Sequence, residues 1–284
     1  MPSLWVLLNQ ISNQLKPVSD NPRFEAELLL AHALNTKRAE LLSKIKEEIT
    51  IPEQLNQWLE RRKKHEPIAY ILGYTEFFGI KIKTVPPVFI PRPETELLVE
   101  ETLKIIKKKN KEKFNILELC TGTGCISIAV YNNACKKVKC IATDINEKAV
   151  ILAKHNTEEN KSSINFIICN LFTSLDDKNK FDIILANPPY IPEKNRDILP
   201  STVKDYEDSR ALFCPGDGTY IIQKIISEAR RYLTMDGWLL LEIGDDQKET
   251  VERIFQENGY DNIKTLFDLQ KLPRVVKGNW NKTK

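Results

Sequence analysis

Residues 115–124 read Asn-Ile-Leu-Glu-Leu-Cys-Thr-Gly-Thr-Gly, an apolar run that leads directly into a turn containing two glycines. The apolar run predicts a short buried strand, and residues 125–131 predict a helix immediately after the turn. A strand, a tight turn and a helix in this order are typical of a parallel α/β sheet. This stretch therefore indicates the fold class, and the segments that follow it test the interpretation.

The alternation of strand and helix continues to the C-terminus. The predicted strands are residues 138–142, 164–168, 181–186 and 238–243, and the predicted helices are residues 147–158, 219–233 and 248–257. Two final extended runs, residues 263–268 and 274–278, predict an antiparallel pair that closes the sheet. The sequence thus predicts an α/β fold whose sheet is mostly parallel with an antiparallel closing strand.

The first quarter of the chain has a different pattern. Two apolar stripes recur at three- and four-residue steps: Trp5, Leu8, Ile11 and Leu15, then Phe24, Leu28, Ala31 and Leu34. Pro22 and Pro52 each follow or lie near a polar cap candidate and predict the starts of two helices. Residues 75–90 alternate between apolar and polar side chains and predict a hairpin. We therefore expect a small helical bundle over residues 1–73, a β-hairpin linker over residues 74–92 and the α/β domain over residues 93–284.

Composition excludes several classes of protein. With 42% hydrophobic and 29% charged residues the chain is expected to be soluble and globular, and it has no run of ~20 apolar residues that could span a membrane. The N-terminus lacks the pattern of an export signal, so a cytoplasmic protein is expected. A net charge of +3 gives little attraction to a polyanion, so no nucleic-acid substrate is expected. The six cysteines form no Cys-x-x-Cys pair and the three histidines are far apart, which predicts no metal site.

Polar residues follow the predicted strands at four places. They are the turn Cys120, Thr121, Gly122, Thr123 and Gly124, then Asp144, then Asn170 with Leu171, and finally Asn187. Ligands of open α/β sheets bind beyond the carboxyl ends of the strands, so these residues are expected to share one site. The alternative for Asp144 alone is the N-cap of the next helix.

A glycine turn followed by an acid at the end of the next strand is typical of nucleotide recognition, where the acid accepts hydrogen bonds from ribose. The third glycine of the dinucleotide fingerprint and the Gly-Lys-Ser/Thr phosphate loop are both missing from this turn. NAD and ATP are therefore less favoured than a nucleoside-like ligand without a pyrophosphate. S-adenosylmethionine fits best.

Residues 187–190, Asn-Pro-Pro-Tyr, form a stiff corner at the end of the fourth strand, because two prolines fix φ and remove two N–H donors. By itself this pattern favours a structural loop in which Asn187 caps a turn. Beside a cofactor site it becomes the candidate for the chemistry. Asn187 and Pro188 would supply fixed acceptors, Tyr190 would pack against a planar acceptor group, and Pro189 would stiffen the loop.

At this point the chain resembles class I, Rossmann-like S-adenosylmethionine-dependent methyltransferases, and among them the protein-(glutamine-N5) methyltransferases of peptide chain release factors. Seven markers carry the resemblance: residues 73–79, residues 90–96, the glycine turn, Asp144, the Asn-Pro-Pro-Tyr corner, residues 210–212 with 216–218, and residues 274–278. The resemblance implies methylation of the glutamine in the Gly-Gly-Gln motif of a release factor, which modulates translation termination. It also implies S-adenosylhomocysteine as the product and a helical N-terminal domain that engages the release factor.

The resemblance assigns the site residues by position. The cofactor is expected to contact residues 120–124, Asp144, Asn170, Leu171 and Asn187, and the substrate amide is expected to contact residues 187–190. Four positions depart from the family pattern: Cys120 replaces a glycine, Glu118 an Asp, Asn170 an Asp that faces the adenine, and Leu171 an aromatic residue. Because a neutral amide lacks charge assistance, somewhat weak cofactor binding is expected.

Other functions suit the same corner. The exocyclic amine of adenine is also a planar conjugated NH₂, so an N6-adenine methyltransferase is the nearest alternative, although the chain has no strongly basic face or target-recognition segment. Methylation of a ribosomal-protein glutamine is a second alternative. A non-catalytic protein that binds the cofactor or a partner is the third. A monomer is expected.

Overall fold

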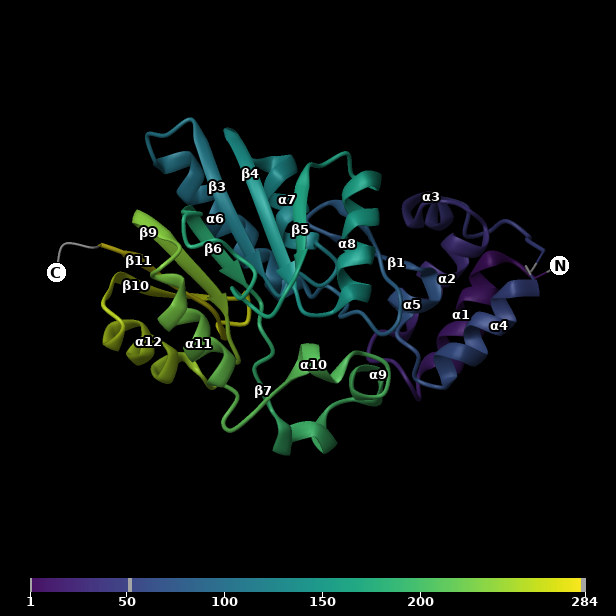
Figure 1. Ribbon diagram of the computed structural model, residues 1–284. Helices are drawn as coiled ribbons and strands as arrows, with labels where there is room; N and C mark the ends of the chain where they lie inside the picture. Colours follow the sequence, from purple (N-terminus) through teal and green to yellow (C-terminus); the bar gives the residue numbers. More distant parts are fainter. Residues whose placement is uncertain (1, 51–52, 282–284) are drawn as a thin grey trace. The chain divides into compact units, whose positions relative to one another are not determined.

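The computed structural model describes residues 2–50 and 53–281 (Figure 1). The chain divides into two compact units. Unit 1 comprises the residues up to Tyr74 together with Pro200–Tyr206, and unit 2 comprises Thr75–Leu199 and the residues from Glu207 onward. In the described part of the chain, no helix is long and apolar enough to cross a membrane.

Unit 1 is built from short helices. They are α1 (Leu4–Leu15), α2 (Pro22–Ala33), α3 (Arg38–Ser43), α4 (Glu53–Lys63), α5 (Ile68–Leu72) and α9 (Ser201–Lys204). The predicted start at Pro22 is confirmed, whereas Pro52 lies outside the described residues. Arg62 of α4 is buried and forms an ion pair with Glu25 of α2 at 2.7 Å, which joins the two helices beside their apolar contacts.

Two residues of the predicted apolar stripes are not in the core of this unit. Trp5 is 56% exposed and Phe24 is 46% exposed. In α1 the inward face is filled by Leu4, Leu7, Leu8, Ile11 and Leu15. The Phe24 ring instead packs under the guanidinium of Arg38, 5.0 Å from the ring centroid. The helices predicted from these stripes are confirmed, although these two aromatic residues lie outside the buried faces of α1 and α2.

A hairpin of β1 (Tyr74–Phe77) and β2 (Ile80–Lys83) lies at the start of unit 2, and only its first residue, Tyr74, is assigned to unit 1. Its two turn residues, Phe78 and Gly79, both have positive φ, as a type I′ hairpin turn requires. The hairpin is followed by the short 3₁₀ helix η1 (Pro93–Thr95) and by α6 (Glu96–Lys108).

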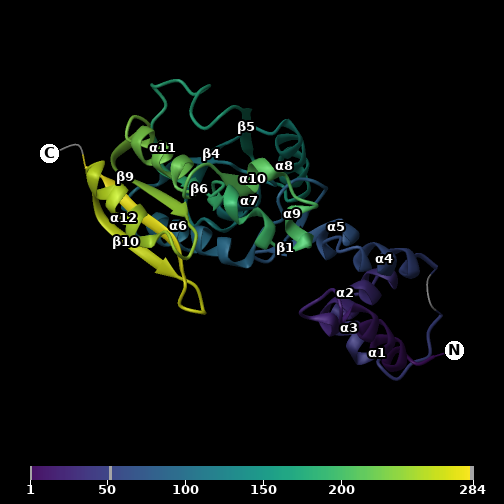
Figure 2. The same cartoon turned by 90° about the horizontal axis from the view of Figure 1, so that it is seen from below.

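A seven-stranded sheet forms the centre of unit 2, in the order β10-β11-β9-β6-β3-β4-β5. The strands are β3 (Lys113–Leu119), β4 (Lys137–Asp144), β5 (Ile164–Ile168), β6 (Phe181–Ala186), β9 (Leu233–Glu242), β10 (Tyr260–Phe267) and β11 (Pro273–Trp280). Five neighbouring strands pair in parallel, and β11 is antiparallel to both β9 and β10. Figure 2 shows the β10 and β11 ribbons in yellow beside β9. The predicted mostly parallel sheet with an antiparallel closing strand is confirmed.

Helices cover both faces of this sheet (Figure 1). Apolar side chains of α6 and α7 (Cys125–Asn133) pack on one face, with α8 (Glu147–Glu159) beside α7. The other face packs against α11 (Tyr220–Ala229) and α12 (Lys248–Glu257). Because both faces are covered, β6 is buried at every position, including Asp182, which pairs with Lys111.

The structure differs from the prediction in two segments. Strand β9 begins at Leu233, not at residue 238, since Leu233 pairs with Phe181 across a register shift. Residues 191–215, for which no strand or helix was predicted, contain a series of short elements. These are β7 (Ile191–Pro192), η2 (Glu193–Ile198), α9, α10 (Ser209–Leu212) and β8 (Phe213–Cys214).

Candidate functional site

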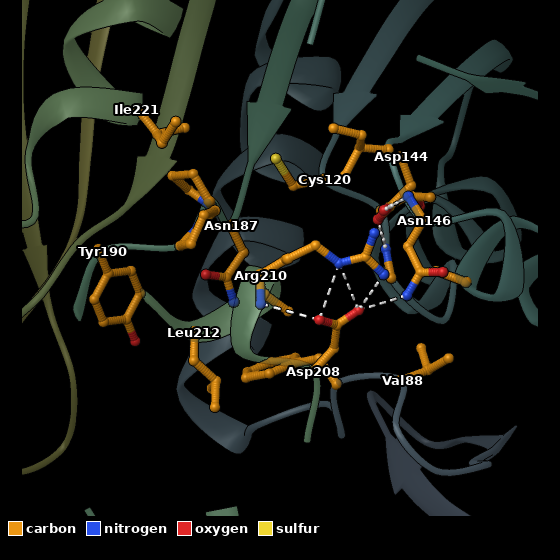
Figure 3. Close-up of a pocket in the computed structure, with 18 of the residues that line it drawn as sticks. Val88, Cys120, Asp144, Asn146, Asn187, Tyr190, Asp208, Arg210, Leu212 and Ile221 are labelled. Atoms are coloured by element: carbon orange, nitrogen blue, oxygen red, sulfur yellow. Dashed lines mark hydrogen bonds and ion pairs between the residues drawn. The ribbon is translucent and has the colours of Figure 1, made fainter. Parts of the chain in front are cut away.

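A cavity of about 340 Å³ lies at the carboxyl edge of the sheet, and all the residues that line it belong to unit 2. The predicted site residues come together here. Cys120 to Thr123, Asp144, Asn170, Leu171 and residues 187–190 all contribute to the wall. Gly124 is the exception, since it lies behind the wall at the N-terminus of α7. Figure 3 shows Asn187 and Tyr190 on one side of this cavity and Asp144 and Asn146 on the other.

The turn after β3 has the tight backbone that the sequence indicates. Gly124 has φ +80, and a Cβ on it would approach the Cβ of Ala153 in α8 to 3.1 Å, so glycine permits close packing of the two helices. Cys120 also has a positive φ, of 55°, in a region that L-residues other than glycine, asparagine and aspartate seldom occupy. Cys120 thus holds a backbone conformation suited to the glycine that the family pattern places there.

Asp144, the last residue of β4, fixes this turn. Its Oδ2 accepts a hydrogen bond from the Gly122 N–H at 2.8 Å, and its Oδ1 accepts one from the Asn146 N–H at 2.8 Å. Burial raises the pKa of Asp144 above its ordinary value, although both N–H groups oppose the rise. The N-cap of α8 is Asn146, whose side chain accepts from the Lys148 N–H at 3.0 Å. Asp144 is therefore not that cap and keeps an acidic group at the cavity.

Asn170 and Leu171 line the cavity just after β5. Asn170 is exposed, which leaves its side chain accessible to a ligand. Leu171 has φ 52, and its carbonyl accepts hydrogen bonds from the Cys169 thiol at 3.2 Å and the Thr143 hydroxyl at 3.3 Å. These contacts hold the Leu171 backbone in its left-handed conformation.

The Asn-Pro-Pro-Tyr corner is braced from several sides. The Asn187 side-chain N–H donates to Thr95 Oγ1 at 3.2 Å, so the amide oxygen is the polar atom left to face a ligand. The Tyr190 hydroxyl donates to Glu242 Oε1 at 3.4 Å, and the Tyr190 carbonyl accepts from Gln247 Nε2 at 3.0 Å. Burial raises the pKa of Tyr190 far above its ordinary value, and the Glu242 charge adds to the rise. The phenol therefore stays protonated.

Sequence reasoning gave no role to a second polar group on the opposite wall. The Asp208 carboxylate accepts from Asn146 Nδ2 at 2.8 Å and pairs with Arg210 at 2.7 Å, as the dashed lines in Figure 3 show. Burial alone would raise the pKa of Asp208, but the hydrogen bonds and charge of Arg210 hold it below its ordinary value. The family marker at residues 210–212 was the available signal, but it gave no spatial partner for Arg210.

The cavity fits an adenosine-containing cofactor. Its volume lies in the range of small-molecule pockets, and it has apolar walls with an acid at the end of the second strand of the α/β unit. Thr121 lines the cavity, and its hydroxyl is buried in the turn beside Glu118. Among the residues that the structure describes, no group of three His, Cys, Asp or Glu could hold a metal ion.

Comparisons with known proteins agree with this geometry. The family model described as the PrmC N-terminal domain matches residues 6–73, and that of the methyltransferase small domain matches residues 91–204. A release factor glutamine methyltransferase of Coxiella burnetii is 38% identical over 97% of this chain and 98% of its own length. A protein of the same name from Aliivibrio fischeri is 38% identical over 92% of both chains.

The chain belongs to the release factor glutamine methyltransferase family. A solved methyltransferase of Pyrococcus furiosus has the same fold, with a TM-score of 0.54 and 18% identity over 72% of this chain and 91% of that chain. The predicted class I methyltransferase fold is thereby confirmed. Thr95, Glu242 and Gln247 are residues whose contacts with the corner became visible only in the structure.

Proposed function

We propose that the chain transfers a methyl group from S-adenosylmethionine to the side-chain N5 of the glutamine in the Gly-Gly-Gln motif of a peptide chain release factor. The observation that carries the proposal is the fixed Asn187 amide, held by Thr95 at the wall of the cofactor-sized cavity. The similarity to release factor methyltransferases, which extends over nearly the whole chain, favours glutamine as the acceptor.

Residues 120–124, Asp144, Asn170, Leu171 and Asn187 would hold the cofactor, directly or through the turn that they form. When bound, S-adenosylmethionine supplies an electrophilic methyl group on a positively charged sulfur. Asp144 is placed to accept hydrogen bonds from ribose, and its anchoring to Gly122 ties that acceptor to the turn.

The corner addresses the low reactivity of an amide nitrogen, whose lone pair is delocalised into the carbonyl. The comparable resonance in a peptide bond gives a rotation barrier of ~18–20 kcal/mol, so losing conjugation during attack is unfavourable. The Asn187 oxygen and the Pro188 carbonyl would each accept one N–H of the substrate amide. These acceptors direct the lone pair and interact more strongly as positive charge develops on the nitrogen.

No side chain has to remove a proton before attack, because the nitrogen becomes acidic only once it carries the methyl group. The Tyr190 ring would pack against the planar amide, with its hydroxyl kept protonated by burial. Pro189 would restrict the loop between these residues. We therefore assign the chemistry to Asn187, Pro188 and Tyr190.

We further propose that residues 1–73 recognise the release factor, that residues 74–92 connect the two domains, and that residues 93–284 carry out methyl transfer. Trp5 and Phe24 expose large aromatic surfaces on α1 and α2, and aromatic side chains are enriched at protein interfaces. Because the proposed substrate is a translation factor, we place the activity in the cytoplasm. We propose a monomer that has no nucleic-acid substrate.

One assay separates this function from the alternatives. Labelled S-adenosylmethionine is supplied with a release factor, with the same factor whose Gly-Gly-Gln glutamine is changed to alanine, with a ribosomal protein fraction, or with adenine-containing DNA. Label should enter only the unaltered release factor. Label in DNA or in a ribosomal protein would replace the proposal with that alternative, and cofactor binding without transfer to any of them would indicate a non-catalytic protein.

A further inference from the structure

A buried carboxyl group lies directly behind the Asn-Pro-Pro-Tyr corner. Glu242, the last residue of β9, is only 2% exposed. Its Oε1 accepts from the Tyr190 hydroxyl at 3.4 Å, while its Oε2 is buried and has no hydrogen-bond partner. Burying an acid that is so incompletely paired is unfavourable, so its presence beside the site calls for an explanation.

The groups that act on the Glu242 carboxyl come from three other elements. Thr95 of η1 and Tyr190 of the corner interact with it directly, while Glu94 of η1 and Arg274 of β11 act on it through their charges. Arg274 is shared, because its Nε donates to Asp268 Oδ2 at 2.8 Å. The Thr95 hydroxyl interacts with Glu242 and also accepts the Asn187 N–H. Thr95 therefore connects the buried acid to the side chain that we assign to the chemistry.

We propose that Glu242 is a positioning residue for methyl transfer, which acts on Asn187 through the hydroxyl of Thr95 and on Tyr190 directly. This inference rests on the proposed function of the corner. A hydroxyl that donates to a carboxylate keeps its lone pairs for the Asn187 N–H. That arrangement orients the Asn187 oxygen toward the substrate, and a chain of hydrogen bonds polarises each of its members.

The ionised form of Glu242 is the one that maintains this series of hydrogen bonds. A protonated Glu242 would itself be a donor and would compete with Asn187 for the Thr95 oxygen. Burial raises the pKa of Glu242 to about 7, with hydrogen bonds from Thr95 and Tyr190 opposing the rise and the Glu94 charge adding to it. Catalysis should therefore increase as the pH rises through about 7.

Glu118 provides a matched control. It is also a fully buried acid at the carboxyl end of a strand, burial likewise raises its pKa to about 7, and one of its oxygens also has no partner. Its other oxygen accepts hydrogen bonds from the Ser127 N–H at 3.1 Å and from the Ser127 hydroxyl, which lie behind the cofactor turn and not at the corner.

The first test needs neither cofactor nor substrate. The side-chain NH₂ signals of Asn187 are followed by NMR from pH 5 to pH 9 and are assigned by their loss in Asn187→Ala. They should shift with a midpoint near 7 in the native chain and in Glu118→Gln, but not in Glu242→Gln or Thr95→Val. A signal that does not titrate in the native chain, or that titrates equally in Glu242→Gln, would overturn the proposal.

The second test measures methyl transfer to the release factor. Glu242→Gln and Thr95→Val should lower kcat by about 10- to 100-fold, a range taken from the loss of outer-shell partners of metal ligands. Thr95→Ser, which keeps the hydroxyl, should restore most of the rate. The rise of kcat/KM near pH 7 should persist in Glu118→Gln and disappear in Glu242→Gln.

The two tests separate the two ideas. Absence of methyl transfer by the native chain would reject the proposed function, while the NMR titration would still decide the link from Glu242 to Asn187. Normal kcat and an unchanged pH profile in a folded Glu242→Gln variant would reject the positioning role alone. Thr95→Val answers the same question if Glu242→Gln does not fold.

Discussion

Asn187 is the residue on which the proposed chemistry depends. Its amide nitrogen is engaged by Thr95, so its oxygen is the acceptor presented to the cavity. Asn187→Ala should lower kcat by about 10²–10³, as is typical when one preorganised hydrogen-bonding group at a transition state is removed. Asn165→Ala, an exposed asparagine on β5 that does not line the cavity, should leave kcat unchanged. Near-normal turnover by a folded Asn187→Ala variant would exclude the mechanism.

Asn170 offers a gain-of-affinity prediction at the same scale. It lines the cavity at the position where the family pattern has an acid that faces the adenine. Asn170→Asp should tighten S-adenosylmethionine binding by about fivefold, because hydrogen bonds to a charged acceptor are roughly twice as strong. Isothermal titration calorimetry measures the change. Asn165→Asp adds the same charge on β5, outside the cavity, and should have little effect on affinity. Equal tightening in both variants would attribute the gain to the overall charge of the protein.

The sequence alone predicted that some of these side chains lie close together, but it did not predict the position of others. Asp144, Asn170 and Asn187 follow consecutive strands, and the parallel arrangement alone places strand ends along one edge. Thr95 precedes the sheet, and its contact with Asn187 spans 92 positions, so no local pattern indicates it. Glu242 did lie within a predicted strand, residues 238–243, but nothing in the sequence distinguished a buried acid facing the corner from a solvated one.

At the scale of elements, the corner after β6 is held by the N-terminal end of α12. Gln247 donates through Nε2 to the Tyr190 carbonyl at 3.0 Å and to the Asp217 carbonyl at 3.4 Å, while its Oε1 accepts from the Gly244 N–H at 2.9 Å. Gly218 packs against this contact. A Cβ on Gly218 would lie 2.1 Å from the Tyr190 carbonyl oxygen, far closer than non-bonded Cβ contacts in proteins.

Gly218→Ala should therefore displace the corner. Gly218 has φ +90, so an alanine there adds backbone strain to the clash. We expect kcat to fall at least about tenfold, together with a lower Tm. Gly216→Ala is the matched control, since Gly216 also has a positive φ, of 70°, but a Cβ on it meets nothing within 4 Å. Thermal melts and turnover are measured for both variants. Gly216→Ala reports backbone strain alone, and Gly218→Ala reports strain together with displacement of the corner. Equal turnover in both would contradict the idea that Gly218 protects the position of Tyr190.

Some boundaries of strands and helices could be predicted from local sequence patterns alone. Strands β5 and β6 and helix α12 begin and end where the apolar pattern predicted. The early start of β9 could not be read from residues 233–237, because its polar and glycine residues are unlike a strand and its pairing begins with a single contact to Phe181. The short elements of residues 191–215 likewise depend on tertiary partners, such as the pairing of Ile191 with Phe213.

For the whole molecule, the two buried acids predict how stability depends on pH. Glu118 and Glu242 have pKa values raised by burial to about 7, compared with the ordinary value of 4.5 that an exposed chain would show. Between these values the folded chain binds more protons than the unfolded chain, so stability falls as the pH rises. The stabilisation is fully present below about pH 4.5 and is lost by the time the pH passes about 7.

Thermal unfolding measured from pH 5 to pH 9 should show this as a Tm that decreases by several degrees up to about pH 7.5 and then levels. The double variant Glu118→Gln, Glu242→Gln should flatten the profile, because neither amide titrates. The acids with lowered pKa values, Asp208, Asp217 and Asp268, titrate below this window and do not obscure it. A native Tm that increases from pH 5 to pH 7 would contradict the prediction.

The path of the chain through unit 1 has a consequence for engineering. Residues 200–206 belong to that unit, and within it the Tyr206 hydroxyl donates to the Lys64 carbonyl at 2.6 Å. Unit 1 is therefore not a continuous segment of the chain that ends at residue 74. A chimera that exchanges only residues 1–74 for those of a relative would pair a foreign bundle with the original α9. A compatible exchange has to carry both segments. The second segment ends at Tyr206, two residues before Asp208, so its C-terminal junction would lie next to residues that line the cavity.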